Sequence, residues 1–335
     1  MAGAMAVVAL VLAAAGPTGA QTNTGTAIGD FLLIEPSARV AGMGNAGTAL
    51  LDGLQSAYFN PAAIGDLHAR SVEFTNCNWL ADITYRYVAG SMPLDRHSAV
   101  FASVTALNSG DIDVRTVDQP LGTGEKYSVT DVAMSLGFGR MISERFSAGL
   151  LVSYVQETIW HSSASTVTLS VGTLYRLSED GLHLGASITN YGTHARFGGR
   201  DLRITYPEDP AQNGSNNQLP GEVYTDQFPV PVMFRVGAGL PLRLGSDTRL
   251  SVAVDALHPS DNTESVCAGA ELAFKNLLSL RCGYQDLFQK DSETGLTVGA
   301  GVRGSFGEAR FHLDYAWADQ GRLESTHRFT LGVTF

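Results

Sequence analysis

Charged residues are scarce in this chain: Asp, Glu, Lys and Arg make up 16% of 335 residues, whereas soluble domains carry about 25%. Beyond the first residues, no apolar run reaches the ~18 residues that a membrane-spanning helix needs. Only three cysteines are present, Cys77, Cys267 and Cys282, so no complete disulfide framework can form. The net charge of −11 argues against a nucleic-acid surface, which would be basic. A membrane β-barrel and a large soluble β-protein are the fold classes that remain.

Sequence motifs for catalysis and metal binding are also missing. The chain has no G-x-S-x-G sequence of a serine hydrolase. Its histidines, for example His183 and His312, show no metal-binding spacing such as H-E-x-x-H. Gly42-Met43-Gly44 is no phosphate loop, because no Lys follows it and no strand precedes it. We therefore expect a protein that is not an enzyme and that holds no metal or cofactor.

The first 20 residues predict a secretory signal peptide. Residues 4–15 form an apolar core, and Thr18-Gly19-Ala20 is a small-residue cleavage site before Gln21. Unusually for such peptides, no Lys or Arg precedes the apolar core, and a start codon assigned too late would explain this. The alternative is a buried N-terminal helix.

From about residue 70 to the end, apolar side chains alternate with small or polar ones, which is the period of a β-strand. Leu278, Leu280 and Cys282, for example, alternate with Ser279 and Arg281. The pattern predicts about fourteen strands of ~10 residues, the length that a tilted strand needs to cross a bilayer. The strands near 71–80 and 97–107 show it poorly. We predict an all-β fold, a transmembrane antiparallel β-barrel over residues 70–335.

Two features favour a membrane barrel over a soluble sandwich. Short connections alternate with longer ones, and the two long loops, about 108–127 and 190–229, fall on the same side, as in outer-membrane barrels. The chain also ends inside a strand, with Phe329, Leu331, Val333 and Phe335 in phase, which resembles the assembly signal of bacterial outer-membrane barrels. We therefore expect a location in the bacterial outer membrane, with its lipid and the barrel-assembly machinery as partners, and no nucleic acid.

The alternation also assigns charged side chains to the lumen. They would form either a selectivity lining or salt bridges that hold the wall to a segment inside it. Across the turn near Asn276 we expect Glu271 and Arg281 to face each other, which for an exposed pair is worth about 0–1 kcal/mol. In the same hairpin Cys267 should point inward and Cys282 outward. The predicted lumen-lining residues are Arg86, Arg235, Glu271, Arg281, Arg303, Asp314 and Arg328.

Residues 27–67 lack the alternation and are rich in Ala, Gly and Leu. They predict short helices and turns within the barrel, so we assign residues 21–69 to an N-terminal plug. The small residues near Met43 permit a close approach of plug backbone to barrel wall. A Pro after Asn favours a turn, so Asn60-Pro61-Ala62 is either a plug hinge or the end of the plug. The candidate plug or gate residues are Arg39, Gly42, Met43, Gly44, Asn60, Pro61 and Ala62.

The head of the chain resembles the PorV/PorQ family of outer-membrane proteins, which belongs to the FadL-like group of fourteen-stranded barrels. The resemblance covers about 70 residues and rests on four segments. They are Gly29-Asp30-Phe31-Leu32, Ala38-Arg39-Val40-Ala41-Gly42-Met43-Gly44-Asn45-Ala46, Tyr58-Phe59-Asn60-Pro61-Ala62-Ala63 and Trp79-Leu80-Ala81-Asp82-Ile83 with Tyr85-Arg86-Tyr87.

This resemblance implies a role in type IX protein secretion, in which the barrel binds secreted proteins through their C-terminal sorting domain or contacts other secretion components. FadL-like relatives imply an alternative, the passage of hydrophobic small molecules, with the N-terminal segment plugging the lumen. The chain is short for the secretion shuttle.

Overall fold

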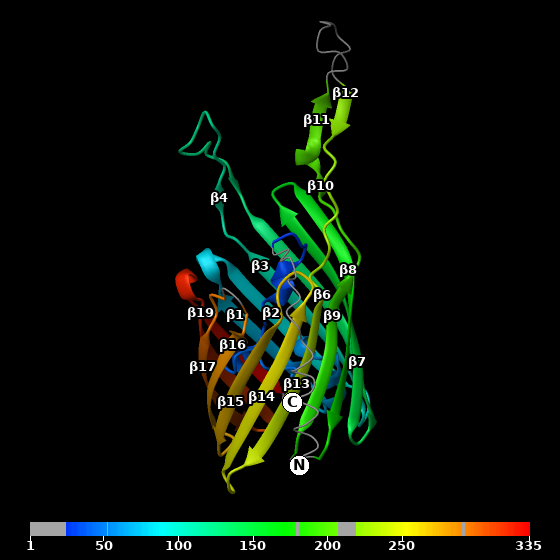
Figure 1. Ribbon diagram of the computed structural model, residues 1–335, viewed down its shortest axis with the longest axis vertical. Helices are drawn as coiled ribbons and strands as arrows, with labels where there is room; N and C mark the ends of the chain where they lie inside the picture. Colours follow the sequence, from blue (N-terminus) through cyan, green and yellow to red (C-terminus); the bar gives the residue numbers. More distant parts are fainter. Residues whose placement is uncertain (1–24, 52, 179–180, 207–218, 290–291) are drawn as a thin grey trace, which may run out of the picture.

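The computed structural model describes residues 25–51, 53–178, 181–206, 219–289 and 292–335. The predicted signal peptide lies outside these residues. In the described part of the chain, fourteen long antiparallel strands form a closed barrel in which β1 pairs with β19 (Figure 1). The strands are β1 (Ser71–Asn78), β2 (Thr84–Pro93), β3 (Ser98–Asn108), β6 (Val129–Ser143), β7 (Phe146–Ile159), β8 (Ser162–Arg176), β9 (His183–Gly192), β13 (Met233–Arg243), β14 (Thr248–Pro259), β15 (Ser265–Phe274), β16 (Leu278–Leu287), β17 (Leu296–Phe306), β18 (Ala309–Asp319) and β19 (Ser325–Thr334).

The fourteen-stranded transmembrane barrel is thus confirmed. Closure has a physical cause: inside a bilayer no water satisfies the backbone groups of an open sheet edge, and each unsatisfied group costs roughly several kcal/mol. The ladder between β1 and β19, from Ser71–Thr334 to Asn78–His327, removes that edge.

The connections differ in length at the two ends of the barrel. Tight turns occupy one end, which we call the short-turn end, and the long-loop end carries extensions that rise above the wall (Figure 1). We expected loops there, but parts of both extensions are strands. The first holds β4 (Ile112–Asp113) and β5 (Lys126–Tyr127), and the second holds β10 (Gly198–Gly199), η4 (Arg200–Leu202), β11 (Arg203–Tyr206) and β12 (Leu219–Glu222). Two short 3-10 helices, η3 (Leu80–Asp82) and η5 (Gly321–Leu323), join strands at the same end.

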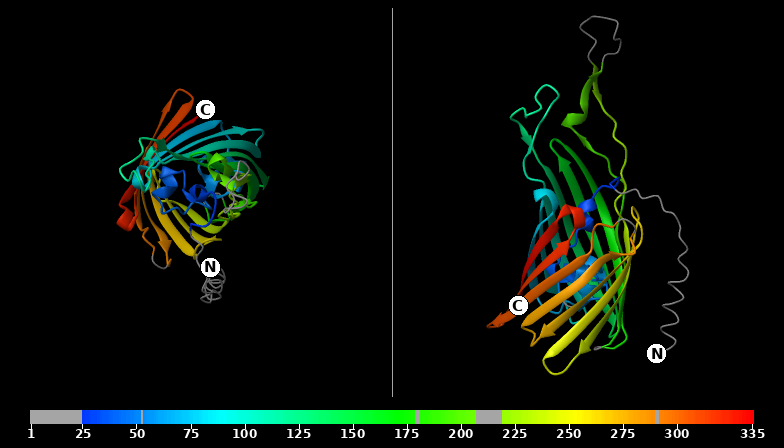
Figure 2. Two further views of the ribbon diagram at one scale, coloured as in Figure 1. Left: turned by 90° about the horizontal axis from the view of Figure 1, so that it is seen from above. Right: turned by 60° about the vertical axis from the view of Figure 1, so that its left-hand side comes forward.

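The plug lies inside the barrel, where Figure 2 shows its blue ribbon within the ring of strands. It consists of η1 (Asp30–Leu33), α2 (Ala38–Ala41), α3 (Ser56–Phe59) and η2 (Pro61–Asp66), joined by turns. Such short helices need caps: Ser37 Oγ accepts from the amide of Val40 at 3.0 Å, and Asn60 Oδ1 accepts from the amide of Ala62 at 3.0 Å. Among the described residues no helix is long and apolar enough to span a membrane.

The two faces of the wall differ as the alternation predicts. Outward aliphatic side chains remain exposed, for example Leu280 at 65%, whereas its inward neighbour Arg281 is 4% exposed. Cys267 is buried inside and Cys282 is exposed outside, as expected.

Strand β2 is an exception, because we predicted Arg86 in the lumen, which would put its neighbours Tyr85 and Tyr87 on the outer face. The two tyrosines are buried, and Arg86 is exposed on the outer wall. Tyr85 donates a hydrogen bond to the carbonyl of Ile34 in the plug at 3.1 Å, and both rings join an apolar cluster that includes Phe31. Both faces of β2 carry apolar residues, so alternation alone could not orient it.

Candidate functional site

A buried chain of charges joins the plug to the wall. Arg39 of α2 donates to both oxygens of Glu271 on β15, at 2.9 Å from Nε and 2.7 Å from Nη2. Arg281 on β16 donates to the same carboxylate at 2.6 Å and to Asp314 on β18 at 2.7 Å. All four side chains are at most 5% exposed. The predicted pairing of Glu271 with Arg281 is confirmed, but the pair is buried, so it is far more costly to break than the exposed pair we expected.

Two further ion pairs connect the same two parts. Glu35 of the plug lies 2.6 Å from Nη1 of Arg328 on β19. Asp66, at the end of η2, lies 2.9 Å from Nη2 of Arg176 on β8. These contacts and the Arg39–Glu271 pair reach three different sectors of the wall, so the plug is fixed against rotation as well as translation.

Polar wall side chains also bind the plug backbone, whose short helices leave many amides without a partner. Asp255 Oδ2 on β14 accepts from the amides of Gly47 and Thr48, both at 2.8 Å. Thr330 Oγ1 on β19 accepts from the amide of Ala38 at 3.1 Å. The inward polar side chains therefore accept hydrogen bonds from plug amides that have no partner within the plug.

Gly42, Met43 and Gly44 lie against glycines of the wall. A Cβ atom added to Gly269 on β15 would overlap the backbone of Met43, and one added to Gly283 on β16 would overlap Met43 and Gly44. The Gly44 amide donates to Thr297 Oγ1 at 3.0 Å. The Met43 side chain is fully buried in an apolar cluster with Cys267. The small residues thus allow the close approach that we predicted.

Asn60-Pro61-Ala62 makes a second close contact on the opposite part of the wall. Asn60 Nδ2 donates to the carbonyls of Thr48 within the plug, at 3.0 Å, and Thr173 on β8, at 2.9 Å. A Cβ at Gly149 on β7 would overlap Pro61 and Ala62. Asn60 therefore joins two parts of the plug to one strand of the wall, and a role as a hinge stays a prediction.

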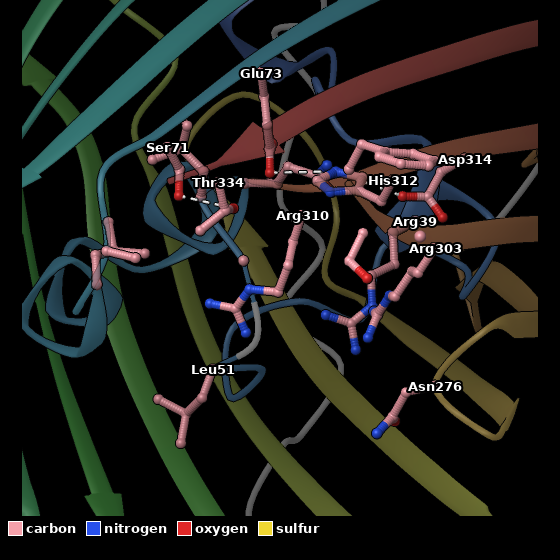
Figure 3. A pocket seen from close by; sticks show the side chains of 18 of the residues that line it. Arg39, Leu51, Ser71, Glu73, Asn276, Arg303, Arg310, His312, Asp314 and Thr334 are labelled. Carbon is pink, nitrogen blue, oxygen red and sulfur yellow. Dashed lines mark hydrogen bonds and ion pairs between the residues drawn. The ribbon is translucent and has the colours of Figure 1, made fainter. Parts of the chain in front are cut away.

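A cavity of about 840 Å³ opens at the short-turn end, below the plug. Figure 3 shows the guanidinium groups of Arg39 and Arg303 beside each other there, with that of Arg310 farther along the lining. Arg249 and Lys275 add further positive charge to the lining. Charges of both signs in the lining are paired: Asp314 binds Arg281, Asp66 binds Arg176, Glu73 lies 3.4 Å from His312, and Arg39 binds Glu271. This cavity suits water and anionic groups and is unsuited to an uncharged hydrocarbon.

A second cavity, of about 480 Å³, lies at the long-loop end, above the plug. Its apolar lining comes from the plug residues Leu33, Tyr58 and Phe59 and from Met233 and Leu257 on the wall. Its size falls in the range of small-molecule sites, about 300–1,000 Å³.

Polar groups that line this cavity are held in fixed positions. Arg235 donates to Thr189 Oγ1 at 2.9 Å, and its guanidinium lies 5.7 Å from the ring centre of Tyr58. At the solvent side, hydrogen bonds from Arg322 lower the pKa of Glu293. The cavity therefore has an apolar lining with charged groups set into it, and Arg235 lies against the Tyr58 and Phe59 rings.

The structure brings together most of the residues predicted from sequence. Arg39, Glu271, Arg281 and Asp314 form one chain of contacts, while Arg303 lines the cavity at the short-turn end and Arg235 the one at the long-loop end. Arg328 pairs with the plug. Arg86 is the exception and faces the outer wall. The side chains of Phe329, Leu331 and Phe335 are exposed, and Val333 is half-buried; their role in assembly stays a prediction.

Sequence reasoning missed Glu35 and Met233. A carboxylate at Glu35, between apolar residues of the plug, signals a buried partner, but nothing in the sequence identifies that partner as Arg328. Met233 lies on the inward face of β13, and its place beside a cavity depends on the plug. Within the described residues no group of three or more His, Cys, Asp or Glu is arranged to hold a metal ion.

No protein-family model and no curated protein matches this sequence. Solved structures do match in fold. The toluene transporter TodX of Pseudomonas putida superposes with a TM-score of 0.57 at 13% identity, over 90% of this chain and 98% of that chain. A Pseudomonas aeruginosa FadL homologue superposes with a TM-score of 0.54 at 10% sequence identity, over 89% of this chain and 98% of that chain. The Ralstonia pickettii toluene transporter TbuX superposes with a TM-score of 0.54 at 13% identity, over 90% of this chain and 97% of that chain. The chain therefore has the fold of the FadL-like outer-membrane barrels.

Proposed function

We propose that this protein is a non-enzymatic outer-membrane channel for hydrophobic small molecules, with the plug as its gate. The observation that carries the proposal is the cavity above the plug, with its apolar floor of Leu33, Tyr58, Phe59, Met233 and Leu257. A molecule arriving from outside would reach this cavity first, since long loops face the exterior in outer-membrane barrels. The toluene transporters of the same fold support this choice of ligand class.

The plug must move for a ligand to pass. The wall is a closed ladder of strands, and the buried charges of Arg39, Glu271 and Arg281 lie between the two cavities. An apolar molecule cannot cross that layer without separating these paired charges. Displacement of the plug opens the lumen, and the ion pairs would close it again.

Binding of radiolabelled toluene to the detergent-solubilised protein tests the proposal. Met233→Trp fills the cavity from an inward position that is 8% exposed, so we expect at least a tenfold loss of retained toluene. Phe234→Trp is the matched control, because Phe234 is the next residue and faces outward at 41% exposure. Equal binding by both variants and the parent protein would exclude the cavity as the ligand site.

A role in type IX secretion is the second candidate. It is supported by the resemblance of residues 29–87 to the PorV/PorQ family and by the hairpins that project beyond the wall at the long-loop end (Figure 2). Tyr224, in the second extension, is 72% exposed. The guanidinium carbon of Arg196 lies 5.1 Å from the centre of its ring. Deletion of the gene should then release surface proteins that bear a C-terminal sorting domain into the medium. Unchanged surface retention of such proteins would count against this role.

A further inference from the structure

Arg86 is a cation on the lipid-facing wall. It is exposed on β2 and makes no hydrogen bond or ion pair with any described residue. Its position is two residues from the start of β2, about 7 Å along the strand, so it lies near the rim of the long-loop end. A charge on the lipid face costs about 2–4 kcal/mol at the bilayer midplane but only about 0–1 kcal/mol near the interfaces. The residue thus sits where its charge is tolerated.

The cross-strand register places polar neighbours around Arg86. Asn76 on β1 is directly opposite. One outward row nearer the rim, Asn78 pairs with His327 on β19 and with Thr84 on β2. Asn78 and His327 are exposed, and His327 Nδ1 lies 2.9 Å from the hydroxyl of Tyr315.

The next outward row toward the membrane centre is apolar. Phe74 on β1 pairs with Val88 on β2 and with Leu331 on β19, and their exposures are 44%, 44% and 50%. Arg86 therefore stands at the boundary between an acyl-chain surface and a polar rim. A molecule bound there must be apolar on one side and polar on the other.

We infer that Arg86, with Asn76, Asn78 and His327, binds a phosphate-bearing lipid headgroup of the outer leaflet. The planar guanidinium matches a phosphate with two parallel hydrogen bonds, and the asparagine amides supply further donors. The acyl chains of the same lipid lie over Phe74, Val88 and Leu331. None of the four side chains is a carboxylate, and exposed Asp82 lies beyond them in the turn between β1 and β2. Arg86 has no hydrogen bond or ion pair to a described residue that it would have to break.

Native mass spectrometry of the full chain in detergent with added lipid A tests the inference. We expect the parent protein to retain lipid A, and Arg86→Gln to bind it about fivefold less tightly, the effect of one cation near a lipid surface. Arg86→Lys keeps the charge without the paired donors, so its affinity should fall in between. Arg140→Gln is the matched control, since Arg140 is also exposed but lies at the short-turn end. The heat-dependent gel mobility of each variant shows that it is folded.

Equal lipid A binding by Arg86→Gln and the parent protein would overturn the inference, as would equal losses in Arg86→Gln and Arg140→Gln. Inorganic phosphate in tenfold excess should leave the complex intact, because the acyl chains contribute to binding. Complete displacement by phosphate would show a free-anion site instead. A protein dimer that disappears in Arg86→Gln would show that a second copy covers the patch, which also overturns it.

Discussion

Replacement of Arg39 by Met should release the plug. Arg39 donates two hydrogen bonds to Glu271, and hydrogen bonds to charged groups contribute about 1.5–3 kcal/mol each. Removing one partner of a buried ion pair costs about 3–5 kcal/mol. Glu271 keeps its bond from Arg281, so we take the lower end, about 3 kcal/mol. At about 1.4 kcal/mol per tenfold change, the ratio of displaced to docked plug should rise about 100-fold.

Single-channel recording in planar bilayers measures this ratio directly, because a displaced plug opens a conducting lumen. The parent protein should open rarely, and Arg39→Met should spend about 100-fold more time open. Arg140→Met removes a guanidinium from an exposed position on β6 and is expected to behave like the parent protein. The unfolding midpoint in denaturant separates loss of the plug contact from loss of the barrel.

A double variant sharpens the test. In Arg39→Met the one cation Arg281 faces two carboxylates, Glu271 and Asp314. Adding Glu271→Gln leaves Arg281 paired with Asp314 alone, so the net charge of this buried group of side chains returns to zero. We expect the double variant to open less often than the sum of the two single effects predicts, which is the coupling that contacting residues show. Additive effects, or an Arg39→Met channel that opens as rarely as the parent protein, would refute the proposal that the Arg39–Glu271 pair holds the plug in place.

Three further predictions address the other contacts. Gly283→Val places atoms where Met43 and Gly44 lie, so the plug should become sensitive to protease at a cost of about 1–3 kcal/mol, while Cys282→Val, facing outward, should not. Asn60→Ala leaves the carbonyls of Thr48 and Thr173 without their donor, and the free energy of unfolding should fall by about 1–3 kcal/mol. Phe335→Ser should reduce the amount of protein in the outer-membrane fraction, whereas Phe306→Ser, an exposed aromatic near a turn, should leave it unchanged; equal fractions would remove Phe335 from the assembly signal.

The wall could be predicted from sequence because lipid on one side and a polar lumen on the other impose a two-residue period. That period gave the strands, the inward Cys267 and the facing pair of Glu271 and Arg281. It failed at β2, where the plug presents an apolar surface to part of the lumen. Tyr85 and Tyr87 pack against that surface, and the rule that apolar residues face lipid no longer holds there.

The contacts of the plug could not be predicted in the same way. Its short helices have no period, and their positions depend on which wall side chains accept or donate. Glu35 and Arg328 are 293 positions apart in the sequence, and only the closed barrel brings them to 2.6 Å. The short strands in the extensions at the long-loop end were also not predicted. Strands of two to four residues, such as β4 and β5, are too short to show an alternation of apolar and polar residues.

A charged lumen usually suggests a hydrated path for solutes, but many of the charges here are matched. Glu271, Arg328 and Arg176 each bind a plug residue of opposite sign, and Asp255 binds plug amides. The inward polar face therefore determines the position of the plug through these contacts, while the outward apolar face determines insertion into lipid. Because alternate residues of each strand serve these two requirements, a substitution such as Arg39→Met or Gly283→Val can alter gating and leave the lipid surface unchanged. The position of the plug and insertion into lipid can thus vary independently on one barrel.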